Sequence, residues 1–123
     1  MLFRSRVDAR FRTRMGICVD TCHVYSAGYD LNADYNGVIA RIADTVGLER
    51  LRVMHLNDSK TPFGSRRDRH ELIGEGSLGD MPFRRIMNDE RLAAVPKVIE
   101  TPKLDDAVAT DTKMIERLRG YVD

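Results

Sequence analysis

The sequence has few cysteines and no long apolar run, and both absences exclude classes of protein. Two cysteines, Cys18 and Cys22, are too few for a disulfide framework, and no second pair is present to complete a zinc knuckle. The longest apolar stretches are a few residues long, far short of the roughly 20 that span a bilayer. The N-terminal residues Met-Leu-Phe-Arg-Ser-Arg lack the apolar core of a signal peptide. The sequence therefore predicts a cytoplasmic protein with no membrane partner.

The sequence also lacks an excess of charge of either sign. Its 20 Lys and Arg residues are balanced by 19 Asp and Glu residues, which gives a formal net charge of +1. Any nucleic-acid-binding surface must therefore be local. A chain of 123 residues is long enough for one small domain. It is too short for a complete (β/α)₈ barrel, which takes about 250 residues.

The chain divides into a short leader, residues 1–14, and one domain, residues 15–123. We interpret the leader as irregular chain or as the remnant of a helix, with phosphate contact as the alternative, since arginine neutralises phosphates. Its basic residues are Arg4, Arg6, Arg10, Arg12 and Arg14.

Short apolar runs predict three strands, at residues 15–20, 51–54 and 96–100. Two polar stretches between them, residues 21–32 and 55–80, predict loops. The second is unusually long for an ordered loop, and such loops are usually functional.

Helical spacing of apolar residues predicts a helix over residues 35–46, with Asp34 as its N-cap and Gly47 as its stop. A short helix is predicted at residues 82–87, and a last helix begins at about Thr110. The alternation of strands and helices predicts parallel βα units in an α/β fold. One face of the last helix is predicted to carry Met114, Ile115 and Leu118.

The stretch from Met54 to His70 holds the strongest candidate for a metal site. It contains two of the three histidines, His55 and His70, and Asp68 lies two residues before the second. Residues two apart project to the same side of an extended segment, so Asp68 and His70 can bind one ion while Arg69 points away. Histidine and aspartate are nitrogen and oxygen ligands of catalytic zinc sites.

The remaining candidates lie at other strand ends. His23 follows Asp20 in the run at residues 16–23, and Glu100 ends the third predicted strand. Functional residues of a parallel barrel gather where the strands end. We therefore predict a metal centre for two divalent ions, with six candidate ligands: Asp20, His23, His55, Asp68, His70 and Glu100.

These stretches resemble the endonuclease IV family of zinc-dependent apurinic/apyrimidinic (AP) endonucleases. G-I-C-V-D-T-C-H at residues 16–23 matches one signature motif, and H-L-N-D-S-K with the later G-S and D-R-H at residues 55–70 matches another. The resemblance covers roughly residues 14–120, and the earlier signature of the family has no counterpart here. It implies the last three or so βα units of a xylose isomerase-like TIM (β/α)₈ barrel, an incomplete barrel.

The resemblance also implies a cluster of three Zn²⁺ ions, through which the ligands act in catalysis. The complete protein ligand set of one ion is matched by His23, Asp68 and His70. Three ligands of a second ion are matched by Asp20, His55 and Glu100. The fourth ligand of that ion, a bridging glutamate on an earlier strand, has no counterpart, nor have the ligands of the remaining ion.

By resemblance, the expected activity is hydrolysis of the DNA backbone 5′ to abasic sites in base-excision repair. The short length predicts a truncated form with little or no activity of its own, which self-associates or assembles with a complementary barrel fragment. Two alternatives stay open: a metal-binding fragment without catalysis, and a metal-dependent sugar isomerase-like barrel.

Other polar residues between 55 and 80 have two interpretations each. The turn at residues 74–76 is a phosphate-approach turn or a solvent turn, unless its Glu75 orients a histidine. Six further residues contact phosphate or form a solvated surface: Asn57, Ser59, Lys60, Arg66, Arg67 and Arg69.

Overall fold

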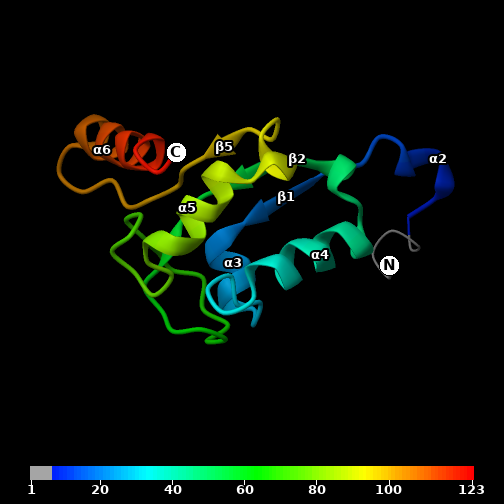
Figure 1. Cartoon of the computed structure of the whole chain (residues 1–123), viewed down its shortest axis with the longest axis horizontal. Coiled ribbons are helices and arrows are strands. Elements are labelled where there is room, and N and C mark those ends of the chain that lie inside the picture. Colours follow the sequence, from blue (N-terminus) through cyan, green and yellow to red (C-terminus); the bar gives the residue numbers. More distant parts are fainter. Residues whose placement is uncertain (1–6) are drawn as a thin grey trace.

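Three parallel strands form the sheet on which the rest of the chain is arranged (Figure 1). The computed structural model describes residues 7–123. Strands β1 (Ile17–Asp20), β2 (Leu51–His55) and β5 (Lys97–Val98) pair in the order β1-β2-β5. The predicted parallel α/β fold is confirmed. The third strand is shorter than predicted, so Glu100 lies two residues past its end rather than at it.

The longer of the two helices between β1 and β2 is where the sequence places it. Helix α4 (Tyr35–Thr45) begins at Asp34, whose Oδ1 accepts a hydrogen bond from Gly37 N at 3.1 Å. It buries Tyr35, Val38 and Ile39 in the core. Its last turn is followed by Gly47 at φ 88°, a conformation that glycine adopts without strain. The predicted N-cap and stop are both confirmed.

A second helix occupies the stretch predicted as a loop after β1. Helix α3 (Thr21–Ser26) begins directly at the end of the strand, because Oδ1 of Asp20 accepts a hydrogen bond from His23 N at 3.2 Å. Six residues are too few to show helical periodicity, so the pattern missed it. An N-cap aspartate at residue 20 and a glycine at residue 28, with φ 103°, are the signals that mark its two ends.

The last two helices begin earlier than predicted. Helix α5 (Asp80–Asn88) holds Pro82 in its first turn, where the missing N–H has no helical partner to lose. Helix α6 (Ala107–Arg119) is capped by Asp106, whose Oδ1 accepts from Ala109 N at 2.9 Å. Ile115 does not share the buried face of α6: it is 39% exposed, whereas Met114 and Leu118 are buried.

The long polar stretch after β2 contains a small antiparallel pair. Strand β3 (Asp58–Ser59) pairs with β4 (His70–Glu71), and Ser59 lies opposite His70. Because β3 begins three residues after β2 ends, this pairing places His70 near the carboxyl end of β2. Three short helices complete the elements of residues 7–123: α2 (Ala9–Arg12), η1 (Leu48–Arg50) and η2 (Glu90–Leu92).

One hydrophobic core joins the sheet to the helices. Its fully buried members come from the sheet, the helices and the segments between them: Ile39, Met54, Leu56, Ile73, Phe83, Ile86, Leu92 and Met114. Of the leader, Arg4 and Arg6 lie outside the described residues. No helix in residues 7–123 is both long and apolar enough to cross a membrane.

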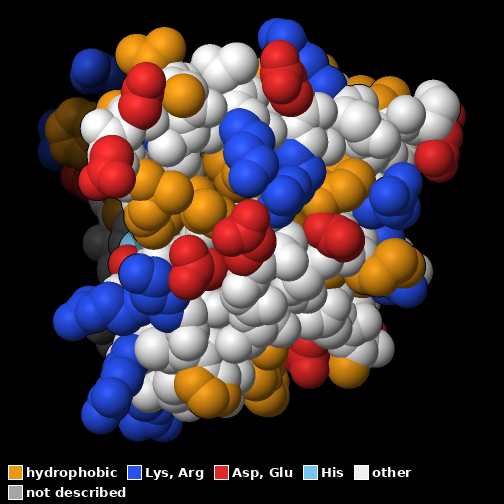
Figure 2. Space-filling view, turned by 90° about the vertical axis from the view of Figure 1, so that its left-hand side faces the viewer, with side chains coloured by type: hydrophobic (Ala, Val, Ile, Leu, Met, Phe, Trp, Pro, Cys, Tyr) orange, Lys and Arg blue, Asp and Glu red, His pale blue; other side chains and the backbone are white. Residues whose placement is uncertain are grey.

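Charge is mixed on the face that looks to the left of Figure 1. Acidic and basic side chains lie interspersed with apolar ones there (Figure 2). This distribution agrees with the near-neutral net charge.

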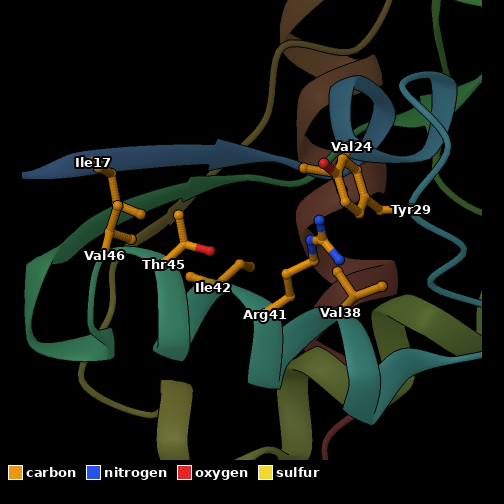
Figure 3. A pocket seen from close by; sticks show the side chains of 8 residues that line it. All are labelled: Ile17, Val24, Tyr29, Val38, Arg41, Ile42, Thr45 and Val46. Atoms are coloured by element: carbon orange, nitrogen blue, oxygen red, sulfur yellow. The ribbon is translucent and has the colours of Figure 1, made fainter. Parts of the chain in front are cut away.

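Both flanks of the sheet carry apolar surface. In the described chain, β1 and β5 each pair only with β2. Beside β1, Ile17, Val24 and Tyr29 lie with side chains of α4 around a pocket of about 170 Å³ (Figure 3). Beside β5, a wider hollow of about 750 Å³ is lined by residues that include Val98 and Ile115. Unpaired strand edges next to apolar surface promote association with another chain.

We expect the chain to dimerise or form larger assemblies at micromolar concentration. Covering apolar surface contributes about 25 cal/mol per Å², so a few hundred Å² stabilise a complex substantially. Ile115→Arg should raise the monomer fraction, because Ile115 lines the β5 hollow. Val108→Arg is the matched control, since Val108 lies on the same helix, is 77% exposed and is outside that hollow. Sedimentation velocity measures both, and a wild-type monomer at all concentrations would contradict this expectation.

Candidate metal centre

The carboxyl ends of the three strands meet at one edge of the sheet and bring the predicted ligands together. Asp20 and His55 are the last residues of β1 and β2, and they lie opposite each other in the register. His55 is in turn opposite Val98 of β5, and Glu100 follows two residues later. Parallel pairing therefore brings together the last residues of β1 and β2 and the segment that follows β5.

The first cluster consists of Asp20, His55 and Glu100. Nδ1 of His55 lies 2.7 Å from Oε2 of Glu100 and 3.7 Å from Oδ2 of Asp20. Candidate ligand atoms of all three residues lie within 4.8 Å of one another, which is close enough to hold one ion. The Asp20 side chain is only 5% exposed and that of Glu100 is 52% exposed, so the cluster runs from the interior to the surface.

The second cluster is centred on Asp68. Its Oδ2 lies 2.7 Å from Nε2 of His23, and its Oδ1 lies 3.2 Å from Nε2 of His70. The rings of the two histidines stand edge-on with centroids 6.4 Å apart. Helix α3 supplies His23 from its first turn, and β4 supplies His70.

The two clusters adjoin at Asp20 and form one site. Oδ2 of Asp20 lies 3.6 Å from Nε2 of His70 as well as 3.7 Å from Nδ1 of His55. All six residues singled out from the sequence are therefore contiguous in the structure. Their use as metal ligands stays a prediction that this geometry supports.

The orientation of His70 provides a test of whether a cation fits. Its Nδ1 lies 2.9 Å from the carbonyl oxygen of Glu100, and a carbonyl only accepts, so Nδ1 carries the proton. In the neutral imidazole, the form that binds metals, the Nε2 lone pair then faces carboxylate oxygens of Asp20 and Asp68. Both Nε2 of His70 and Oδ1 of Asp68 are buried without a hydrogen-bond partner among the described residues. Converging acceptor atoms repel one another unless a cation lies between them, so a divalent metal ion fits here.

Cys22 lies next to the second cluster and is a competing ligand. It is fully buried, and its sulfur can share an ion with Asp68 and His70 by distance. The Cys22 thiol, however, donates a hydrogen bond to the carbonyl of Arg69 at 3.6 Å. Burial raises the pKa of Cys22 to about 11. The hydrogen bond of the thiol and the 2.7 Å contact between His23 and Asp68 favour His23 over Cys22 as the third ligand.

We therefore expect His23→Ala to remove one bound zinc ion and Cys22→Ala to leave the metal content unchanged. The pair is matched, because the two residues are neighbours in the same short helix. Zinc per chain can be measured by inductively coupled plasma mass spectrometry after gel filtration. The reverse pattern would assign the ligand to the cysteine.

The carboxylate of Asp58 fills the turn at residues 74–76, which the sequence analysis interpreted as either a phosphate-approach turn or a solvent turn. Its carboxylate accepts backbone hydrogen bonds from residues 59, 74, 76, 78 and 79, at 2.7 to 3.2 Å. Burial raises the pKa of Asp58, and these backbone amides oppose the rise. The amides of Gly74 and Gly76 point at this carboxylate, so the phosphate-approach interpretation is wrong. Glu75 pairs with Arg117 at 3.3 Å rather than with a histidine.

The six residues for which the sequence allowed phosphate contact differ in their exposure to solvent. Asn57 and Ser59 are fully buried, which excludes them from contact with a phosphate at the surface. Lys60 and Arg69 are exposed and adjacent, because Lys60 N donates to Arg69 O at 2.9 Å. Arg66 and Arg67 are exposed as well.

This chain is similar in sequence to one described protein family and to named proteins of other organisms. A family model described as "Xylose isomerase-like TIM barrel" matches residues 4–118. The "Probable endonuclease 4" of Persephonella marina is 50% identical over 109 residues, which cover 87% of this chain and 37% of that protein. Its counterpart in Akkermansia muciniphila is 52% identical over 103 residues, covering 84% of this chain and 36% of that protein.

Solved structures agree with these relatives. Endonuclease IV from Thermus thermophilus superposes with a TM-score of 0.77 and 38% identity, over 86% of this chain and 38% of that one. The AsfvAP:AG crystal structure, at 19% identity and a TM-score of 0.69, has the same fold over 98% of this chain and 43% of its own. The chain thus spans little more than a third of the length of the curated relatives named above.

Proposed function

This chain belongs to the xylose isomerase-like TIM-barrel family, and from that premise we propose that it carries two zinc sites of an endonuclease that cleaves DNA 5′ to abasic sites. One site would consist of His23, Asp68 and His70. The other would consist of Asp20, His55 and Glu100. Because the chain covers about 37% of the Persephonella marina protein, the activity is proposed for a complete barrel rather than for these residues alone.

The observation that carries the proposal is the pair of buried, unpartnered atoms at the centre of the site. Nε2 of His70 and Oδ1 of Asp68 face each other at 3.2 Å with no hydrogen-bond partner among the described residues. Burying polar atoms without partners costs free energy, which a bound cation would offset. Three imidazoles and three carboxylates are nitrogen and oxygen donors of the kind that bind catalytic zinc.

The chain's own residues would hold the metal and admit a substrate. Each cluster supplies three ligands, the number that leaves a coordination position open in catalytic zinc sites. When bound, zinc would supply Lewis acidity toward a phosphodiester and an activated water at neutral pH. The exposed side chains of His23 and Glu100 lie on the open side of the site, where a duplex could approach. Lys60 and Arg69 would neutralise phosphates beside it.

A chimera tests the proposal. The matching segment of the Thermus thermophilus endonuclease IV, 38% of that chain, is replaced by this chain. We expect the folded chimera to incise a duplex containing one abasic site and to leave an undamaged duplex intact. The same chimera with His70→Ala should lose incision, whereas Asp105→Ala, an exposed carboxylate far along the sequence, should keep it. A folded, zinc-loaded chimera without incision would contradict the proposal.

The 123-residue chain alone is expected to bind zinc and to leave the abasic duplex uncut. The reason is that the family pattern includes further metal ligands, and this chain has no counterpart for them. Incision at about 1 s⁻¹ or faster, an ordinary enzymatic rate, would show that its own residues suffice. Binding of manganese or magnesium in preference to zinc would favour the sugar-isomerase alternative. The cytoplasmic location stays a prediction.

A further inference from the structure

Asn57 joins two of the proposed ligands through a single side chain. Its Nδ2 donates to Oδ2 of Asp20 at 2.9 Å, and its Oδ1 accepts from the backbone N–H of Glu100 at 2.8 Å. Asp20 ends β1, whereas Glu100 follows β5, and these two strands do not pair with each other. The amide of Asn57 therefore bridges the chain segments at the ends of the two outer strands.

The position and orientation of this amide are fixed. A carboxylate accepts and a backbone N–H donates, so the nitrogen must face Asp20 and the oxygen must face Glu100. The backbone of Asn57 is held on both sides by Thr21: Asn57 N donates to Thr21 Oγ1 at 2.9 Å, and Thr21 Oγ1 donates to Asn57 O at 2.6 Å. Both residues are 0% exposed, so water does not compete for these bonds.

We propose that Asn57 is a positioning residue that sets the spacing of Asp20 and Glu100 for the ion of the first cluster, an inference that rests on the proposed zinc sites. The Asp20 oxygen that it holds, Oδ2, is the atom facing both His55 and His70. A hydrogen bond to that oxygen directs its remaining lone pair toward the ion. Partners that orient metal ligands in this way typically contribute roughly 10- to 100-fold to metal affinity.

The two clusters allow this role to be separated from general stabilisation. Both side-chain hydrogen bonds of Asn57 go to residues of the first cluster. Removing the amide should therefore weaken the ion held by Asp20, His55 and Glu100 and affect the ion held by the Asp68 cluster much less. A residue that only supports the fold would change both sites together, or neither.

The experiment is a zinc titration by calorimetry on the full chain, with His55→Ala used to identify the isotherm of the first ion. We expect Asn57→Ala to weaken that ion by roughly 10- to 100-fold. Asn88→Ala is the control, because the Asn88 side chain bonds backbone groups of Arg84, Tyr121 and Asp123 in another part of the fold. It should change neither isotherm.

A measurement on the unsubstituted chain covers the case in which Asn57→Ala fails to fold. The side-chain amide resonances of Asn57 should shift when the first ion binds, and those of Asn88 should not. Unchanged affinity in Asn57→Ala, or an unmoved Asn57 amide signal, would overturn the positioning role alone. Absence of the first ion from the unsubstituted chain would overturn the proposed zinc sites as well, so the two failures are distinct.

Discussion

Asp58→Ala is expected to lower the free energy of unfolding by about 3 kcal/mol or more. The carboxylate is fully buried and accepts hydrogen bonds from five backbone amides. An unsatisfied buried donor costs about 1–3 kcal/mol, although water can reach the half-buried Gly74, Gly76 and Gly79 and recover part of the loss. Most of the hydrogen bonds that this substitution removes come from backbone amides of the turn at residues 74–79.

Urea denaturation followed by circular dichroism measures this effect. Asp58→Asn keeps the shape but replaces one acceptor oxygen with a donor, so its stability should fall between wild type and alanine. The exposed Asp105→Ala is the control and should stay within about 0.5 kcal/mol of wild type. An Asp58→Ala variant as stable as that control would show that the turn does not depend on the carboxylate.

His70→Ala is expected to remove one of two zinc ions per chain. His70 is the only proposed ligand that faces both Asp20 and Asp68, and its Nδ1 also bonds the backbone of Glu100. Its loss should therefore release the ion of the Asp68 cluster and weaken the neighbouring one. Elemental analysis of gel-filtered protein gives the count directly.

Arg69→Ala is the matched control for this variant. Arg69 is the preceding residue and is exposed, with its guanidinium bonded to a backbone carbonyl. Its replacement should leave two ions bound. Equal zinc content in wild type and His70→Ala would remove His70 from the ligand set.

The sequence predicted the parallel strands and the grouping of the candidate ligands because both depend on local patterns. Short apolar runs mark the strands, and the ends of parallel strands meet at one edge, so Asp20 and His55 were expected to be neighbours. The D-x-H spacing predicted that the side chains of Asp68 and His70 lie on the same side of the chain and bind one ion. In the structure these two side chains face each other. Such inferences need no knowledge of distant contacts.

The features that the sequence did not predict depend on contacts between distant residues. Asn57 bonds residues 37 and 43 positions away, and its motif at residues 55–60 does not show which residues its side chain contacts. The glycine turn at residues 74–76 has the composition of a phosphate loop, but a carboxylate from β3 occupies its amides. Helix α3 was missed because six residues carry too little periodicity, although its N-cap is also a proposed ligand.

X-ray absorption at the zinc edge tests most directly whether the ends of three parallel strands and β4 form two adjoining zinc sites. For the zinc-loaded chain we expect two bound ions, with three histidines shared between them. Their nearest ligand atoms should be nitrogen and oxygen at about 2.0–2.2 Å. A sulfur shell at about 2.3 Å, or no zinc retained after gel filtration, would contradict the two proposed sites.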